Sequence, residues 1–177
     1  MRVRWGVVPV VVVLGAVWMR AQAPARTPDI HFTPTRHVVA DAMLQLANVG
    51  PSDVVYDLGS GDGRIPIIAA QKYGARGVGI ELDPNLVELS WRVANEAEVA
   101  NRVKFVVADL FDVDLGPATV VAMYLSPSML RRLEPKLRGL KPGTRIVTNQ
   151  FALPTWKPDR TMKVEEAEIF LWTVPPR

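Results

Sequence analysis

The chain has 177 residues, a length that suits one domain with a short appendage, and 49% of them are hydrophobic, enough for a packed core. It has no cysteine, which excludes disulfides, thiolate metal sites and cysteine nucleophiles, and two histidines are too few for a histidine-rich metal site. The net charge is +3, but residues 1–26 carry four arginines and no acid, so the remaining 17 basic and 18 acidic side chains sum to −1. A nearly neutral body does not favour a surface that follows nucleic-acid phosphates; we expect no metal ion and no nucleic-acid partner.

The first 25 residues have the pattern of a targeting segment. Arg2 and Arg4 precede an apolar run over residues 5–18, and small residues follow it at Ala21, Ala23 and Ala25. This order is typical of a secretory signal peptide, and the run is shorter than the roughly 20 residues that a membrane-spanning helix needs. An uncleaved membrane anchor is the main alternative, and a buried strand of the main fold is a weaker one.

We therefore expect a signal peptide or membrane anchor over residues 1–25, a proline-containing linker over 26–34 and one domain over 35–177. In this interpretation the protein is exported or membrane-associated through its N-terminal segment. A cytoplasm-facing anchor is the alternative. The arginines would hold the N-terminus inside in either membrane interpretation.

Helix and strand patterns alternate through the main domain. Apolar residues at three- and four-residue spacing predict a helix from Thr35, which Gly50 and Pro51 end. Further elements are expected in chain order, namely helices at 65–73, 84–97 and 127–140, strands at 53–58, 77–82, 103–107, 119–125 and 144–149, and a closing hairpin from strands at 161–165 and 168–174. This alternation predicts an α/β fold with a single doubly wound, mostly parallel seven-stranded sheet and a C-terminal antiparallel hairpin.

A glycine-rich turn follows the first predicted strand, in the sequence VVYDLGSGDGR. Gly59, Gly61 and Gly63 form the pattern G-x-G-x-G, whereas the dinucleotide-binding fingerprint has its third glycine one position later, where Arg64 stands. Glycines let a ligand approach the backbone, and the following helix offers free N–H groups to an anion. Asp57, at the end of the strand, would repel a pyrophosphate but could accept hydrogen bonds from an ammonium group. The turn therefore favours a ligand that carries both an ammonium and a carboxylate.

Two further acids stand near the ends of the next strands. Glu81 ends the second strand, where its carboxylate can accept both hydroxyls of a ribose. Asp109 follows the third strand, in reach of an adenine at the same edge of the sheet. Adenine, ribose, ammonium and carboxylate together describe S-adenosylmethionine. Plain surface roles are the alternative for Glu81 and Asp109, and Asp62 is open between a helix cap and a ligand contact.

The motif D-x-G-x-G-x-G in DLGSGDGR, followed by GIELDP, resembles that of the class I (seven-β-strand) S-adenosylmethionine-dependent methyltransferases. With FTPT upstream and FALPTWKPD near the end, the chain is similar to the small mitochondrial-type lysine methyltransferases of the adenine nucleotide translocase and the ATP synthase c-subunit, and to their bacterial relatives. The resemblance implies a Rossmann-like methyltransferase domain over 35–177. By matching position it implies cofactor contacts at Asp57, Gly59, Ser60, Gly61, Gly63, Glu81, Asp109 and Thr35, the last within the segment that covers the cofactor in such enzymes.

The acceptor end of the site is expected after the fourth predicted strand. The N-P-P-Y box of enzymes that methylate amino groups of bases or of glutamine is missing there. Tyr124 and Ser126 could offer hydroxyls and an aromatic wall to an amine, so we expect a substrate pocket at Tyr124, Ser126 and Trp156. For Trp156 a packing role is the alternative. Methyl transfer mainly needs alignment and exclusion of water, so Tyr124 and Asn149 are candidates for catalytic contacts without a named base.

These features predict an S-adenosylmethionine-dependent methyltransferase that N-methylates a lysine side chain of a protein. Two alternatives stay open: a small-molecule O- or N-methyltransferase, and a non-catalytic module that binds the adenosyl group. The expected partner is therefore a protein or small-molecule methyl acceptor, and residues 5–18 would associate the enzyme with a membrane.

Overall fold

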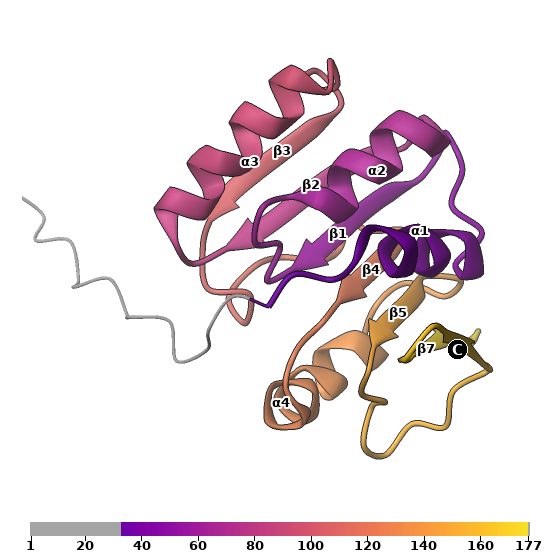
Figure 1. Ribbon diagram of the computed structural model, residues 1–177. Coiled ribbons are helices and arrows are strands. Elements are labelled where there is room, and N and C mark those ends of the chain that lie inside the picture. Colours follow the sequence, from indigo (N-terminus) through magenta and orange to yellow (C-terminus); the bar gives the residue numbers. More distant parts are fainter. Residues whose placement is uncertain (1–32, 177) are drawn as a thin grey trace, which may run out of the picture.

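The computed structural model describes residues 33–176, so the predicted signal peptide or anchor over 1–25 lies outside the described residues. Figure 1 shows that the described chain forms one twisted sheet with helices packed against it. Within this part of the chain, no helix is both long and apolar enough to cross a membrane.

Seven strands form one sheet. They are, in chain order, β1 (Val54–Leu58), β2 (Arg76–Glu81), β3 (Val103–Val107), β4 (Val120–Met123), β5 (Arg145–Asn149), β6 (Arg160–Val164) and β7 (Ala167–Thr173). In space their order is β3-β2-β1-β4-β5-β7-β6. Strands β1 to β5 pair in parallel, whereas β7 is antiparallel to β5 and β6 is antiparallel to β7. The predicted mostly parallel seven-stranded sheet with a C-terminal antiparallel hairpin is confirmed.

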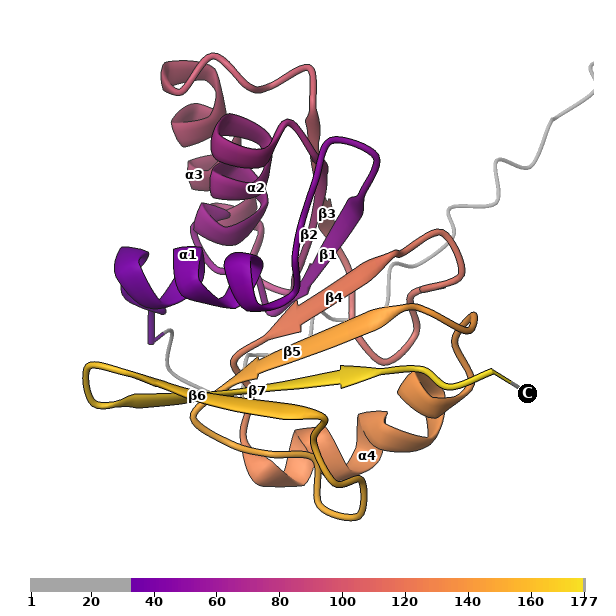
Figure 2. The same ribbon diagram turned by 90° about the vertical axis from the view of Figure 1, so that its right-hand side faces the viewer.

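Helices cover both faces of the sheet. Three of them, α1 (His37–Leu46), α2 (Arg64–Tyr73) and α3 (Pro84–Glu96), lie on one face, and α4 (Pro127–Arg138) lies on the other (Figure 2). The predicted helix from Thr35 begins two residues later, and the strand predicted over 119–125 is shorter because the chain leaves the sheet after Met123.

Alternate residues of each strand supply the two cores. Val55 and Val147 pack with α1 and α2, whereas Leu58 and Ile146 pack with the buried leucines of α4. Asp57 follows Val55 by two positions and therefore emerges on the α1–α2 side of the sheet.

The parallel strands place their carboxyl ends at one edge of the molecule, which faces downward in Figure 1. Strand β1 lies between β2 and β4, so the winding of the chain reverses there. Ligands of open α/β sheets bind in the crevice at such a reversal, outside the carboxyl ends of the strands. The fold therefore predicts a ligand site at the residues that follow β1 and β4.

Candidate active site

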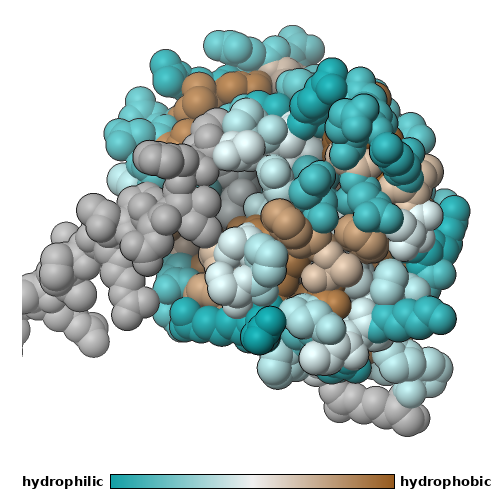
Figure 3. Space-filling view, turned by 60° about the horizontal axis from the view of Figure 1, so that its bottom comes forward, coloured by the Kyte–Doolittle hydropathy of each residue, from teal (hydrophilic) through white to brown (hydrophobic). Residues whose placement is uncertain are grey.

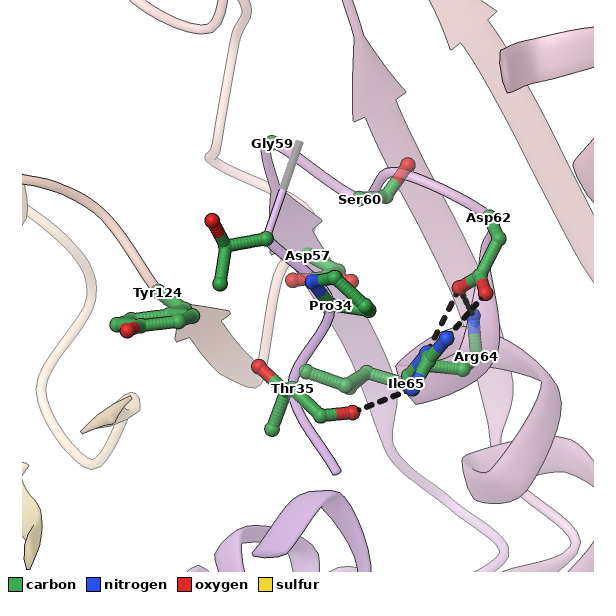
Figure 4. Close-up of a pocket in the computed structure, with 10 residues that line it drawn as sticks. Pro34, Thr35, Asp57, Gly59, Ser60, Asp62, Arg64, Ile65 and Tyr124 are labelled. Carbon is green, nitrogen blue, oxygen red and sulfur yellow. Dashed lines mark hydrogen bonds and ion pairs between the residues drawn. The ribbon is translucent and has the colours of Figure 1, made fainter. Parts of the chain in front are cut away.

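A pocket opens at this reversal point. Figure 4 shows the side chains around it, and its lining residues are Thr33, Pro34, Thr35, Asp57, Gly59, Ser60, Asp62, Arg64, Ile65 and Tyr124. They come from the segment before α1, the end of β1, the glycine turn, the first turn of α2 and the residue after β4. Of the predicted cofactor residues, the pocket brings together Thr35, Asp57, Gly59 and Ser60, and it adds Tyr124 from the predicted acceptor side.

The glycine turn has the backbone conformation that its sequence requires. Gly59, Gly61 and Gly63 have φ values of 78°, 54° and 77°, a left-handed region in which side chains are strained. A Cβ atom on Gly63 would also lie 2.6 Å from the ring of Phe105 and 2.8 Å from Ser90. Gly63 therefore lets α2 and α3 pack closely against β3, a role that the sequence motif did not reveal.

Asp57 lies at the bottom of the turn, with only 3% of its surface exposed. The pKa of its carboxyl is raised from 3.8 to about 8, mainly by burial and then by the nearby carboxylates of Glu81 and Asp62, while Arg64 lowers it. A cationic partner lowers the pKa of such a buried carboxyl, because the cation stabilises the ionised form. The site therefore favours a ligand ammonium at Asp57.

Glu81 holds the turn from the neighbouring strand. Its Oε2 accepts a hydrogen bond of 2.9 Å from the amide of Gly61. Its Oε1 accepts from the amides of Leu82 and Asp83 at 2.7 and 3.0 Å. These bonds fix the carboxylate at the end of β2 and leave Oε2 a second lone pair that a ribose hydroxyl can use.

Asp109 lies in the turn after β3, the strand that pairs with the strand ended by Glu81. Its Oδ1 accepts a hydrogen bond of 3.0 Å from the amide of Phe111, which shapes the turn. Val107, which pairs with Glu81 across the two strands, is 51% exposed. An exposed apolar residue beside these two acids fits the flat face of an adenine.

Arg64 is the site residue whose contacts the sequence did not predict. Its Nε donates to Asp62 Oδ1 at 2.8 Å, its Nη2 forms an ion pair with Asp62 Oδ2, and its Nη1 donates to the carbonyl of Thr35 at 2.7 Å. Figure 4 shows these bonds as dashed lines. Arg64 thus ties the glycine turn to the segment that crosses the pocket. Asp62 holds the Arg64 side chain, and its Oδ1 also accepts from the backbone amide of Arg64, the first residue of α2, at 3.3 Å.

Tyr124 lines the pocket, but Ser126 and Trp156 do not. Ser126 is the N-cap of α4, and its Oγ accepts from the amide of Met129 at 3.4 Å. Trp156 packs in the core beneath α4, where the guanidinium of Arg138 lies 4.7 Å from its ring centroid. The contacts of Trp156 are therefore those of a packing residue, the alternative to a place in the substrate pocket.

Asn149, the other predicted catalytic contact, ends β5 and is 5% exposed. Its Oδ1 is buried and has no hydrogen-bond partner among the described residues. Met123 pairs with Thr148, so Asn149 stands beside Tyr124 one step further along the two strands. The sheet register thus brings the two predicted catalytic residues side by side.

The parallel sheet with its antiparallel end, the D-x-G-x-G-x-G turn after β1 and the acid at the end of β2 define an S-adenosylmethionine-dependent methyltransferase. Asp57, the turn amides and Glu81 fit the ammonium, carboxylate and ribose of that cofactor. A family model for the ANTKMT methyltransferase domain matches residues 57–160, and the chain belongs to this family.

Individual relatives extend the match beyond that range. A protein-lysine N-methyltransferase of Saccharolobus islandicus (strain REY15A) is 38% identical over 144 residues, which cover 80% of this chain and 89% of the relative. The adenine nucleotide translocase lysine N-methyltransferase of Mus musculus is 43% identical over 122 residues, 66% of this chain and 51% of the relative.

Among solved structures, an RNA methyltransferase from Salinibacter ruber in complex with S-adenosyl-L-homocysteine is 50% identical, with a TM-score of 0.80. The match covers 82% of this chain and 95% of that chain. The predicted fold, the methyltransferase activity and the cofactor S-adenosylmethionine are confirmed.

Proposed function

We propose that this methyltransferase N-methylates the side chain of a protein lysine. The observation that carries the proposal is the similarity to a protein-lysine N-methyltransferase that is covered over 89% of its length. So long a match includes the acceptor side of the fold as well as the cofactor side. The mouse relative, an adenine nucleotide translocase lysine N-methyltransferase, supports the same substrate class.

The residues of the site suit an amine acceptor. S-adenosylmethionine, when bound, supplies an electrophilic methyl group, and the chain supplies alignment and exclusion of water. Asp57 and Glu81 would hold the ammonium and ribose, while Tyr124 closes the acceptor side of the pocket. A lysine amine has a pKa near 10.4 in water, and its pKa falls when the amine leaves water, so a buried amine can become the neutral nucleophile without a dedicated base.

RNA is the competing acceptor, because the relative from Salinibacter ruber is described as an RNA methyltransferase. The charge of the described residues gives this acceptor no support: residues 33–176 hold 16 basic and 17 acidic side chains, a sum of −1. Two aromatic rings are also covered by arginines, Phe111 by Arg132 at 3.6 Å and Trp156 by Arg138 at 4.7 Å. Covered rings cannot serve as stacking platforms for bases.

The test is methyl transfer from labelled S-adenosylmethionine by the full chain, incubated with membrane protein, soluble protein, total RNA and low-mass metabolites from its own cells. We expect label in protein, recovered as methyl-lysine after hydrolysis, and none with an Asp57→Ala enzyme. Label found only in RNA or only in low-mass compounds would contradict the lysine proposal.

We also propose that residues 1–25 associate the enzyme with a membrane or direct its export. The proposal rests on the arginines, the apolar run and the alanines of that segment. A fusion of residues 1–34 to a reporter that is active only outside the cytoplasm should be active. A mature N-terminus near residue 24 or 26 would indicate cleavage, and a full-length product in the soluble fraction would contradict both forms of the proposal.

A further inference from the structure

We propose that the end of β5 is the binding site for the acceptor amine, with Asn149 Oδ1 accepting a hydrogen bond from the nitrogen that is methylated. The ligand class is a primary or secondary amine at the end of an aliphatic chain. This inference rests on the proposed lysine substrate and names the group that would hold it.

The register of the sheet places Asn149 beside the pocket. Met123 of β4 pairs with Leu58 of β1 on one side and with Thr148 of β5 on the other. The next residues along β4 and β5 are Tyr124 and Asn149, which therefore leave the sheet together at its carboxyl edge. Tyr124 already lines the pocket.

The side chains also share a face of the sheet. Val55 and Val147 both pack on the α1–α2 side. Asp57 and Asn149 follow them by two positions each, so they emerge on that same side. Asp57, which lines the pocket with Tyr124, is the expected cofactor contact. Asn149 is not among the residues that line the pocket, but it lies on the same side of the sheet and next to Tyr124, which does.

The side-chain oxygen of Asn149 accepts no hydrogen bond from the described residues. Within residues 33–176, two buried side-chain atoms lack a hydrogen-bond partner: Asn149 Oδ1 and Ser60 Oγ, the second belonging to a residue that lines the cofactor pocket. Both belong to residues that leave the sheet at its carboxyl edge. A buried polar atom without a partner costs stability, and a ligand that supplies the missing bond explains why such an atom is retained.

The backbone after Asn149 is strained and fixed. Gln150 has φ of 69°, a left-handed conformation that a residue with a side chain adopts at a cost. Its amide donates to the carbonyl of Glu168 at 2.7 Å, and the hydroxyl of Thr148 donates to the carbonyl of Phe151 at 2.6 Å. Strain that the surrounding structure maintains is characteristic of ligand sites.

Apolar surface next to this turn suits the methylenes of a lysine. Phe151 is 38% exposed, one of three large hydrophobic residues exposed within residues 33–176. Figure 3, which brings the bottom of Figure 1 forward, shows apolar residues gathered in the middle of this face with hydrophilic residues around them. A lysine side chain that enters here would keep its aliphatic part against apolar surface and bring its nitrogen to the carboxyl edge of the sheet.

An amide oxygen is suited to an amine that must be neutral and oriented. It accepts one N–H and leaves the nitrogen lone pair free to point elsewhere, but it cannot take the proton away. The proton is lost to water as the amine leaves the solvent, because desolvation lowers the pKa of the amine. Asn149 is therefore a substrate-orienting group and not a base.

The test compares Asn149→Leu and Asn149→Asp in the full chain, with Asn95→Leu as the matched control. Asn95 is exposed on α3, so it undergoes the same replacement away from the site. Two readouts are taken: affinity for S-adenosylhomocysteine by calorimetry, and the initial rate of methyl transfer to protein lysine in the extract that the unmodified enzyme labels. Asn149→Leu should slow transfer about 10–100-fold while the affinity stays within about twofold. Asn149→Asp keeps an acceptor oxygen and should keep most of the rate.

Each outcome has a distinct meaning. Equal rates for Asn149→Leu and the unmodified enzyme would overturn the inference, as would a loss of cofactor affinity as large as the loss of rate. If the Leu enzyme does not fold, the isosteric Asp enzyme decides, and a loss in it of about 10-fold or more at unchanged affinity would overturn the role of the oxygen. If the unmodified enzyme labels no protein lysine, the proposed function fails together with this inference.

Discussion

The two sides of the site are built differently. On the cofactor side, at the ends of β1 and β2, acids and glycines lie close in sequence. Glu81 accepts hydrogen bonds from three backbone amides there, one of which is the Gly61 amide of the glycine turn. On the acceptor side, at the ends of β4 and β5, neutral and apolar residues come from distant parts of the chain, and Asn149 Oδ1 is left without a partner. The cofactor side is thus organised in advance for one ligand, whereas the acceptor side keeps a polar atom open.

The largest effect expected from this comparison is at Asp57. Asp57→Asn removes the charge that would pair with the ligand ammonium, and losing one partner of a buried pair costs about 3–5 kcal/mol. Affinity for S-adenosylhomocysteine, measured by calorimetry, should therefore fall at least about 100-fold. Asp112→Asn, at an exposed acid, is the control and should bind normally. Normal affinity in the Asp57 variant would remove the carboxylate from the cofactor side.

Glu81 should matter less than Asp57, because its hydrogen bonds are partly exposed. Glu81→Ala removes the acceptor for the ribose and also the bond to Gly61. The expected loss of affinity is about 1.5–3 kcal/mol, the value of hydrogen bonds to a charged group. Calorimetry with S-adenosylhomocysteine measures it. Unchanged affinity would leave Glu81 with only its bonds within the protein.

The cofactor side could be predicted from the sequence because its residues lie close together in the chain. Asp57 and the glycines stand within seven residues, and their motif requires the turn that is observed. The acceptor side could not be read in the same way. Whether Ser126 faces a pocket or caps a helix depends on where β4 ends, and Trp156 is held by α4 through Arg138.

Arg64 shows the same limit within the cofactor side. Its position one residue after the third glycine marked it only as a departure from the dinucleotide-binding fingerprint. Its partner Thr35 lies 29 residues earlier in the chain, so no local pattern joins them. The position of a cation close to Asp57 and Asp62 in the sequence is the signal that could have indicated its role.

Cofactor binding should depend on pH through Asp57. Its pKa of about 8 in the free protein lies above the usual 3.8, so the carboxyl is mostly protonated at pH 7. Binding an ammonium requires the ionised form, and about 0.9 proton should be released per cofactor at pH 7. Affinity should weaken about tenfold for each pH unit below 8. Calorimetry in buffers of different ionisation enthalpy measures the released proton, and its absence would contradict the raised pKa.

The same shift has a consequence for stability with a definite sign. Since the folded pKa lies above the unfolded one, the unfolded carboxyl ionises first as the pH rises. The contribution of Asp57 to the free energy of unfolding therefore decreases from about pH 4 to about pH 8. The Asp57→Asn variant should lack this decrease in denaturant titrations across that range. If both proteins lost stability equally, another group would be responsible.

The smallest effect is expected at Arg64, which contacts the segment before α1 that contains Thr35 and is expected to cover the cofactor. Arg64→Gln removes the ion pair with Asp62 and the bond to Thr35, so the segment loses its tie to the glycine turn. We expect S-adenosylhomocysteine to dissociate about 5–10-fold faster in stopped-flow measurements, as a charge-assisted hydrogen bond is worth about 1–2 kcal/mol here. Arg36→Gln, which breaks an exposed pair with Glu165 in the same stretch, should leave the rate unchanged. Arg64 also lowers the pKa of Asp57, so its removal should shift the pH dependence of binding upward. A shifted pH profile with an unchanged dissociation rate would mean that Arg64 acts through its charge and does not hold the covering segment.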